Sequence, residues 1–491
     1  MSNQTISSNG KSGRQSVGFD LNNFKVSLNF GFLIENPLTS LPAYYSAWNT
    51  LTEQLPELYK AKRVREAVHQ LPLLDYKQLS GHRQLRLAHL QLSFIAAGYV
   101  WQNGDACIPK SLPKSLAVPF YHISELLGIQ PVLCHASLAL ANWRLIDPNG
   151  AFDFENVQCI YHIPGGYSGD WFCITTFMVE FNFAKCLKNF VEIMNLLNVA
   201  KELNARDKSG TTIENQTALQ LDEVTNVIHL MNKSLARMHD HLDAKTFFNE
   251  VRPFLAGWGG EGTPMSNGLI YEGISSTPIK ALGGSAAQST TLQALDGLLG
   301  IEHKEGQKEF LVKMRNYMPP EHRRFVEYLE NRPYGLRHLV ESTTNDVLKS
   351  SYNNCITALV QLRTYHIQIV SKYILAASVG MNEGKYKSLD SKGTGGTSIM
   401  PFLKVVRADT ETKLIGSRQS KKFSKMSWLT IGAVTAIGGA VIFGAVQFLK
   451  QKYLSPTELI LKRSTFSKSI SVGWLPSPQN DDQKVILKIK I

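Results

Sequence analysis

His366 is the residue whose type and setting point most directly to chemistry. It lies in the segment Cys355 to Leu375, in which apolar residues recur at three- and four-residue steps along one helical stripe. A buried neutral imidazole beside an apolar cavity can ligate a metal or a haem iron. Periodicity alone favours the other interpretation, a core histidine with a hydrogen-bond partner. Ligation therefore needs support from residues elsewhere in the chain.

The other short motifs are weaker signals. His239 and His241 could supply metal ligands, but side chains two positions apart on a helix diverge by roughly 200°. A charge cluster at a helix C-terminus is the favoured interpretation. The run 393–397, Gly-Thr-Gly-Gly-Thr, lacks the lysine of a phosphate-binding loop and predicts a mobile loop instead. Hydrolase chemistry has little support, because Gly-x-Ser-x-Gly and His-Glu-x-x-His are both absent.

Composition is that of a folded globular protein. The 491 residues can bury a large core in two or more domains, and 43% of them are hydrophobic. The six cysteines are scattered without a Cys-x-x-Cys pair, which predicts free thiols in a reducing compartment and excludes the simple zinc spacings. The chain begins MSNQTISSNG, which predicts no secretory signal. Helical periodicity dominates and strand-like alternation is sparse, so a mainly α protein is expected.

The net charge of +12 is concentrated at the C-terminal end. Residues 401–491 hold 15 Lys or Arg and 5 Asp or Glu, a balance of +10 that leaves about +2 for the first 400 residues. No stripe of basic residues interleaved with aromatics occurs in those first 400, so no nucleic-acid partner is expected.

An uncharged run, residues 427–449, lies within this basic end. It is long enough to cross a hydrocarbon core of roughly 30 Å and is flanked by a basic linker, 411–426, and a polar basic tail, 450–491. The run predicts a membrane protein with a single C-terminal transmembrane helix and its catalytic domain in the cytoplasm. The alternative is a buried helix of a soluble domain, rich in glycine and alanine.

Several ordered blocks together resemble indoleamine 2,3-dioxygenase. The run LRTYHIQIVSKYIL is preceded by FLAGW, GGSAAQST and MRNYMPPEHRRF and followed by KGTGGTSIMPFLK, and the earlier runs LPAYYSAWNTL and RLAHLQLSFIAAGYVW agree too. The resemblance spans about residues 36–415. It implies a two-domain all-helical haem dioxygenase fold, to which the transmembrane helix is added. We expect a disordered start at 1–23, a small helical domain at 24–163 and a large haem-binding catalytic domain at 164–410.

The resemblance implies a monomeric enzyme with one haem b. Such an enzyme cleaves the C2–C3 bond of the indole of L-tryptophan, or a related indoleamine, with O₂ and yields N-formylkynurenine, the first step of the kynurenine pathway. By its position in the motif, His366 would be the axial iron ligand. Arg363 and Asp296 correspond to family residues that support the haem electrostatically.

The resemblance also implies a substrate pocket. An indole needs flat apolar walls, and its carboxylate needs a planar cation. The positions that match the family's pocket are Phe172 and Phe247 as walls, Arg252 for the carboxylate, Thr176, Ser285 and Ala286 along the cavity, and Thr394 on the mobile loop.

Three positions depart from the mammalian pattern. His135 stands where those relatives have Tyr, Leu138 where they have Cys, and Thr176 where they have Ser. These changes could alter substrate affinity or stereoselectivity. The alternative function is an O₂-binding haem protein of the same family without significant dioxygenase activity. Retention of Arg252 argues against it, because an oxygen carrier has no use for a carboxylate-binding residue.

Overall fold

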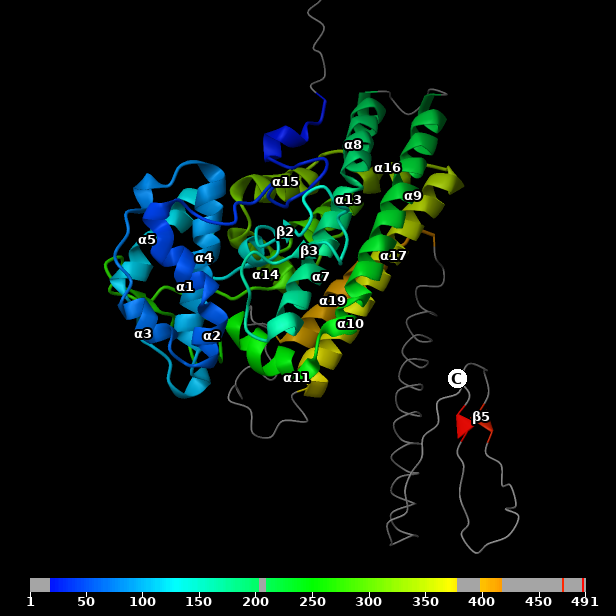
Figure 1. Ribbon diagram of the computed structural model, residues 1–491. Helices are drawn as coiled ribbons and strands as arrows, with labels where there is room; N and C mark the ends of the chain where they lie inside the picture. The colour runs from blue at the N-terminus through cyan, green and yellow to red at the C-terminus, as the bar shows by residue number, and fades with distance from the viewer. Residues whose placement is uncertain (1–17, 203–208, 378–397, 417–469, 472–487, 490–491) are drawn as a thin grey trace, which may run out of the picture. The chain divides into compact units, whose positions relative to one another are not determined.

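Helices make up nearly all of the secondary structure that the computed structural model describes (Figure 1). The described residues are 18–202, 209–377, 398–416, 470–471 and 488–489. The chain divides into two compact units, Met1–Ser417 and Arg418–Ile491. The prediction of a mainly helical protein is confirmed.

The first group of helices in Met1–Ser417 surrounds α4 (Gly81–Trp101), which is buried from Arg86 onward. Shorter helices pack against it and lie together in Figure 1. Gly98 allows one of them to approach, because a Cβ at that position would lie 2.9 Å from Cδ1 of Leu55. The helices around α4 are α1 (Ser46–Glu53), α2 (Leu55–Lys60), α3 (Val64–His69), α5 (Lys114–Leu127) and α6 (His135–Leu138).

The second group in the same unit is built on long helices that lie side by side: α17 (Asp346–Val370) packs along α9 (Ser209–Ala236) and α19 (Ile399–Glu411), while α7 (Gly166–Ala184) also packs on α9 (Figure 1). The Asn345 side chain caps α17 by accepting hydrogen bonds from two backbone N–H groups of the first turn. The other helices are α8 (Leu187–Glu202), α10 (Met238–His241), α11 (Ala244–Thr246), α12 (Arg252–Phe254), α13 (Thr290–Leu299), α14 (Glu305–Met314), α15 (Pro320–Glu330) and α16 (Leu336–Ser342).

Strands are short, as the sparse alternation predicts. Each described strand has two residues. A parallel pair joins the first group of helices to the second half of the unit, and an antiparallel pair precedes α7. The pairs are β1 (Ser111–Leu112) with β4 (Ile270–Tyr271), β2 (Arg144–Leu145) with β3 (Val157–Gln158), and, in the unit Arg418–Ile491, β5 (Ile470–Ser471) with β6 (Lys488–Ile489).

The predicted membrane localisation is corrected. Within the described ranges, no helix combines the length and the apolar content that a bilayer crossing requires. The longest helices there carry charged side chains and bury one face against neighbouring helices, as α9 and α17 do. The run 427–449, on which the transmembrane prediction depended, lies outside the described residues.

The expected disorder of residues 1–23 does not hold for residues 18–23. Residues 18–23 were expected to be disordered because of their polar neighbours, yet Phe19 and Leu21 are buried. The Phe19 ring stacks on Tyr328 of α15 at 5.2 Å between ring centroids, so apolar burial fixes this stretch. The boundary between domains 24–163 and 164–410 stays a prediction.

Two buried histidines, His89 and His322, lead us to expect that the free energy of unfolding falls at acidic pH. Burial lowers the pKa of His89 and of His322 to about 3, whereas an unfolded chain has histidines near 6.5. Below pH ~6.5 the unfolded chain therefore binds protons that the folded chain does not, and the free energy of unfolding falls as the pH falls toward 3. We expect a loss of about 1.5 kcal/mol per histidine between pH 6.5 and 5, measured by urea unfolding.

A pair of variants isolates this effect. His89→Gln should flatten the pH dependence by about one proton, while His69→Gln, at an exposed position of α3, should leave it unchanged. Equal pH slopes for wild type and His89→Gln would contradict the assignment.

Candidate functional site

His366 lies near the C-terminal end of α17, and its side chain is only half-buried although most of this helix is packed. Burial and the neighbouring Arg363 charge lower the pKa of His366 to about 4, so the ring is neutral at physiological pH. Within the described ranges its imidazole has no hydrogen-bond or ion-pair partner. A neutral ring nitrogen without a partner can donate its lone pair to a metal.

Arg363, one turn before His366, forms a buried ion pair with Asp296 of α13. Its Nη2 lies 2.7 Å from both carboxylate oxygens, and its Nη1 donates to the Thr410 hydroxyl. Burial would raise the pKa of Asp296, but the Arg363 charge and a hydrogen bond from His303 outweigh it and keep the pKa below its usual value. The pair therefore remains ionised beside His366.

His303 extends this pair into a buried network that the sequence analysis missed. Its Nε2 donates to Asp296 at 3.0 Å, and its Nδ1 lies 3.4 Å from a carboxylate oxygen of Asp409 on α19. The network thus connects α13, α17 and α19. Only the polar character of His303 and Asp409 was visible in sequence, and polarity alone does not indicate a contact.

Two predicted pocket residues, Phe172 and Phe247, are brought into contact. Their ring centroids are 5.2 Å apart, and Phe247 in turn lies 6.0 Å from the ring of Tyr373. Phe247 begins a π-helical turn, Phe247–Val251, and Tyr373 lies in another, Ser371–Ala376, which continues α17 after His366. Such turns are frequent at functional sites. The aromatic cluster therefore adjoins the helix that carries His366.

Arg252 follows the first π-helical turn directly and begins α12. Its side chain is 2% exposed, and the guanidinium carbon lies 5.5 Å from the Phe248 ring centroid. A guanidinium held in place by packing is pre-organised for a bidentate contact with a carboxylate. Phe247 and Arg252 lie at the two ends of the same π-helical turn. This turn therefore fixes the position of the cation relative to the aromatic wall.

The segment that contains Ser285 and Ala286 is fixed by hydrogen bonds within the segment and by one hydrogen bond from α6. Ser285 caps a short 3₁₀ turn, Ala286–Gln288, in a reciprocal capping box with Gln288. The Gln288 side chain also accepts a hydrogen bond from the backbone N–H of His135, at 3.0 Å. Ala286 is exposed in the described structure, which leaves space beside it.

His135 makes a buried hydrogen bond to Glu180 of α7, at 2.8 Å between Nε2 and Oε1. Ser289 and Thr291 donate to the same carboxylate, at 2.6 and 2.5 Å. Burial would raise the pKa of Glu180, but these three donors hold it below its usual value. Glu180 lies one turn after Thr176, so one carboxylate ties the proposed pocket helix to α6 and to the start of α13.

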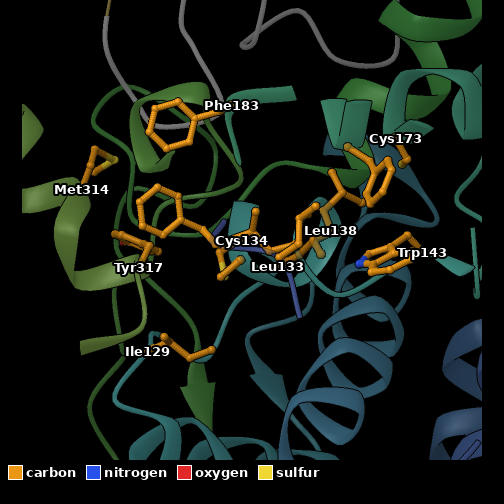
Figure 2. Packing of buried hydrophobic residues seen from close by; sticks show 14 of the residues in the cluster. Ile129, Leu133, Cys134, Leu138, Trp143, Cys173, Phe183, Met314 and Tyr317 are labelled. Carbon is orange, nitrogen blue, oxygen red and sulfur yellow. The ribbon is translucent and has the colours of Figure 1, made fainter. Parts of the chain in front are cut away.

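Glu180 was missed as a site residue, although a single carboxylate in the apolar run WFCITTFMVEFNFA was a usable signal. Leu138, another departure from the mammalian pattern, is buried in the cluster that also contains Trp143 and Cys173 (Figure 2). It contributes apolar packing next to the helix that carries Phe172. The expected mobile-loop residue, Thr394, lies outside the described residues.

Comparison with known proteins decides the family. The sequence profile of indoleamine 2,3-dioxygenase matches residues 20–413. The chain belongs to the indoleamine 2,3-dioxygenase family. Human indoleamine 2,3-dioxygenase 2 is 38% identical over 412 residues, covering 82% of this chain and 98% of the human protein. Rat indoleamine 2,3-dioxygenase 1 is 38% identical over 403 residues, covering 80% and 96%. A myoglobin of Haliotis madaka is 42% identical over 391 residues, covering 80% and 98%.

These relatives confirm the resemblance and the prediction that the chain is an oxidoreductase of the indoleamine 2,3-dioxygenase family. They carry two different names, indoleamine 2,3-dioxygenase and, in Haliotis madaka, myoglobin. The substrate and the extent of the dioxygenase activity therefore have to be inferred from the residues of the site.

Proposed function

We propose that this protein is a haem b dioxygenase that cleaves the indole C2–C3 bond of L-tryptophan with O₂ and releases N-formylkynurenine. The observation that carries the proposal is His366, a neutral imidazole without a partner in the described ranges, on a helix of a chain in the indoleamine 2,3-dioxygenase family. The proposal includes the two-domain haem dioxygenase fold, with one haem bound in the second helical group.

The residues around His366 fit a haem. A lowered pKa keeps the ring nitrogen available for iron, since protonation would compete only near pH 4. The ion pair of Arg363 and Asp296 holds two ionised groups one turn from His366, where they would support the cofactor electrostatically. Haem would supply the iron centre that binds and activates O₂.

The substrate residues would bind and orient L-tryptophan. Phe172 and Phe247 would place aromatic faces against the indole ring, and the planar guanidinium of Arg252 would bind the carboxylate. Contacts at both ends of the amino acid would restrict its rotation, so the indole C2–C3 bond would be held in one orientation. Phe247 and Arg252 are buried and Phe172 is half-buried, so these side chains would exclude water from the bound ring.

The second candidate is an O₂-binding haem protein without significant dioxygenase activity. The specific observation in its favour is the 42% identity to a protein named myoglobin. Both functions need His366, so this residue does not separate them. Arg252 does, because its buried guanidinium serves an amino-acid carboxylate and has no role in holding O₂.

One assay separates the two candidates. The purified full-length protein, loaded with haem and reduced, is mixed with L-tryptophan and O₂, and N-formylkynurenine is followed by its absorbance. We expect multiple turnovers. A normal oxygen-bound spectrum without product would favour the oxygen carrier, and failure to bind haem would contradict both.

A further inference from the structure

A second cavity of about 370 Å³ lies away from the residues assigned to the proposed site, in the unit Met1–Ser417. Its wall contains three aromatic side chains, Phe154, Tyr167 and Trp171, with centroid distances to Trp171 of 5.2 Å from Phe154 and 5.9 Å from Tyr167. Its volume lies within the range of small-molecule sites in proteins. The aromatic walls can accept a flat ring.

The cavity and the proposed substrate pocket use opposite faces of α7. Tyr167, Trp171 and Ile174 recur at steps of four and three residues and line the cavity. Phe172 and Thr176 lie roughly 150° around the helix from that stripe. A ligand in the cavity therefore does not compete directly for the proposed tryptophan pocket.

The rim of the cavity is apolar and exposed. Ile146 and Tyr167 each keep 59% of their surface in contact with solvent, although both are large hydrophobic side chains. Trp171, next to them, is buried and fixed by a 2.7 Å hydrogen bond from its indole N–H to the backbone carbonyl of Arg237. A rigid wall with an exposed apolar rim gains from the burial of a ligand ring.

Arg237 and the two carboxylates that contact it carry one net negative charge beside the cavity. Arg237 lies 4.2 Å over the Phe154 ring and is contacted by two carboxylates, Asp240 at 2.8 Å and Glu155 at 3.4 Å. One guanidinium thus faces two carboxylates. The third carboxyl group nearby needs no ligand, because Asp170 pairs with His162 at 2.8 Å and this hydrogen bond raises the pKa of His162.

We propose that this cavity binds a flat aromatic amine, with the ring against Trp171 and Tyr167 and the ammonium group near Glu155. An electronegative π-face attracts a cation, and the Arg237 guanidinium already lies over the Phe154 and Trp171 rings, at 4.2 and 5.4 Å from their centroids. The excess carboxylate disfavours an aromatic acid of the same shape. The ligand class thus differs from that of the proposed catalytic pocket, whose Arg252 selects a carboxylate.

The test uses tryptamine as the probe and indole-3-propionate as its anionic counterpart, with calorimetric titration into haem-loaded full-length protein. Tryptamine should bind more tightly than the acid in this cavity. Tyr167→Ala should weaken tryptamine binding about tenfold by removing a stacking wall. Glu155→Gln should weaken it about threefold, as expected for an exposed charge pair, since Glu155 is 71% exposed.

Two matched variants locate the binding. Leu126→Ala removes an equally exposed hydrophobic side chain of α5, outside the cavity, and should leave tryptamine affinity unchanged. Phe247→Ala changes the proposed substrate pocket, which can itself take an indoleamine, and the component of tryptamine binding that depends on Tyr167 should persist in this variant. Weakening by Phe247→Ala without weakening by Tyr167→Ala would place tryptamine in the substrate pocket and overturn the proposal. Absence of binding, or equal affinity for the acid in this cavity, would overturn it too.

Discussion

Replacement of His366 by Ala is expected to remove most of the haem from the purified protein and to abolish tryptophan oxidation. The neutral ring is the proposed bond to iron, and no other histidine, Cys, Asp or Glu group within the described ranges forms a cluster that could hold a metal instead. Loss of a contact that merely supports a ligand costs 10–100-fold in metal affinity, so loss of the ligand should cost at least tenfold. Haem content is measured by absorbance against protein concentration.

Two controls distinguish ligation from misfolding. Added imidazole should partly restore haem binding to His366→Ala, because it supplies the same nitrogen to the space that the substitution opens. His229→Ala, at an exposed position of α9, should retain full haem content. If His366→Ala holds haem with unchanged optical bands, the iron has another ligand. The observation on which the proposed function depends would then be wrong.

The sequence named individual candidate residues but not the contacts among them. The helical stripe identified His366 and placed Arg363 one turn before it, because helix geometry fixes such spacing locally. The pairing of Arg363 with Asp296 joins residues far apart in the chain, and the extension to His303 and Asp409 adds a third helix. Local periodicity does not predict these contacts between helices, because they form only when the helices pack.

The same limit explains what was missed around α7. The run WFCITTFMVEFNFA was identified as an apolar helix, yet Glu180 within it joins three elements through His135 and two hydroxyl groups. A carboxylate in such a run must have partners, but the sequence does not name them. The π-helical turns that hold Phe247 and Tyr373 were also unforeseen, because they depend on tertiary packing rather than residue propensity.

Charge and hydropathy led to one prediction that was wrong, the membrane localisation. The predicted membrane localisation depended on one uncharged run, 427–449, outside the described residues, and hydropathy alone does not separate a spanning helix from other apolar segments. The predicted disorder of residues 1–23 was wrong for residues 18–23. The prediction followed the polar composition of this stretch and gave too little weight to Phe19 and Leu21, which are buried.

The choice between an enzyme and an oxygen carrier depends most on Arg252. Replacement by Ala is expected to lower kcat/KM for L-tryptophan by about 10²–10³-fold, because truncating one partner of a buried, hydrogen-bonded charge pair costs 2–5 kcal/mol. Haem content should not change. Arg252→Lys should recover only part of the loss, since Lys keeps the charge but not the planar pair of N–H donors.

The decisive comparison is with L-tryptophanamide, in which a neutral amide replaces the carboxylate. Its kcat/KM should be low and nearly insensitive to Arg252→Ala, because the interaction that the substitution removes is already absent. Arg315→Ala provides the stability control: Arg315 is also buried, but it pairs with Glu330 outside the proposed site. It should lower thermal stability without this substrate selectivity. If Arg252→Ala reduces both substrates equally, or lowers haem content as well, Arg252 supports the fold rather than the carboxylate, and the argument against an oxygen carrier fails with it.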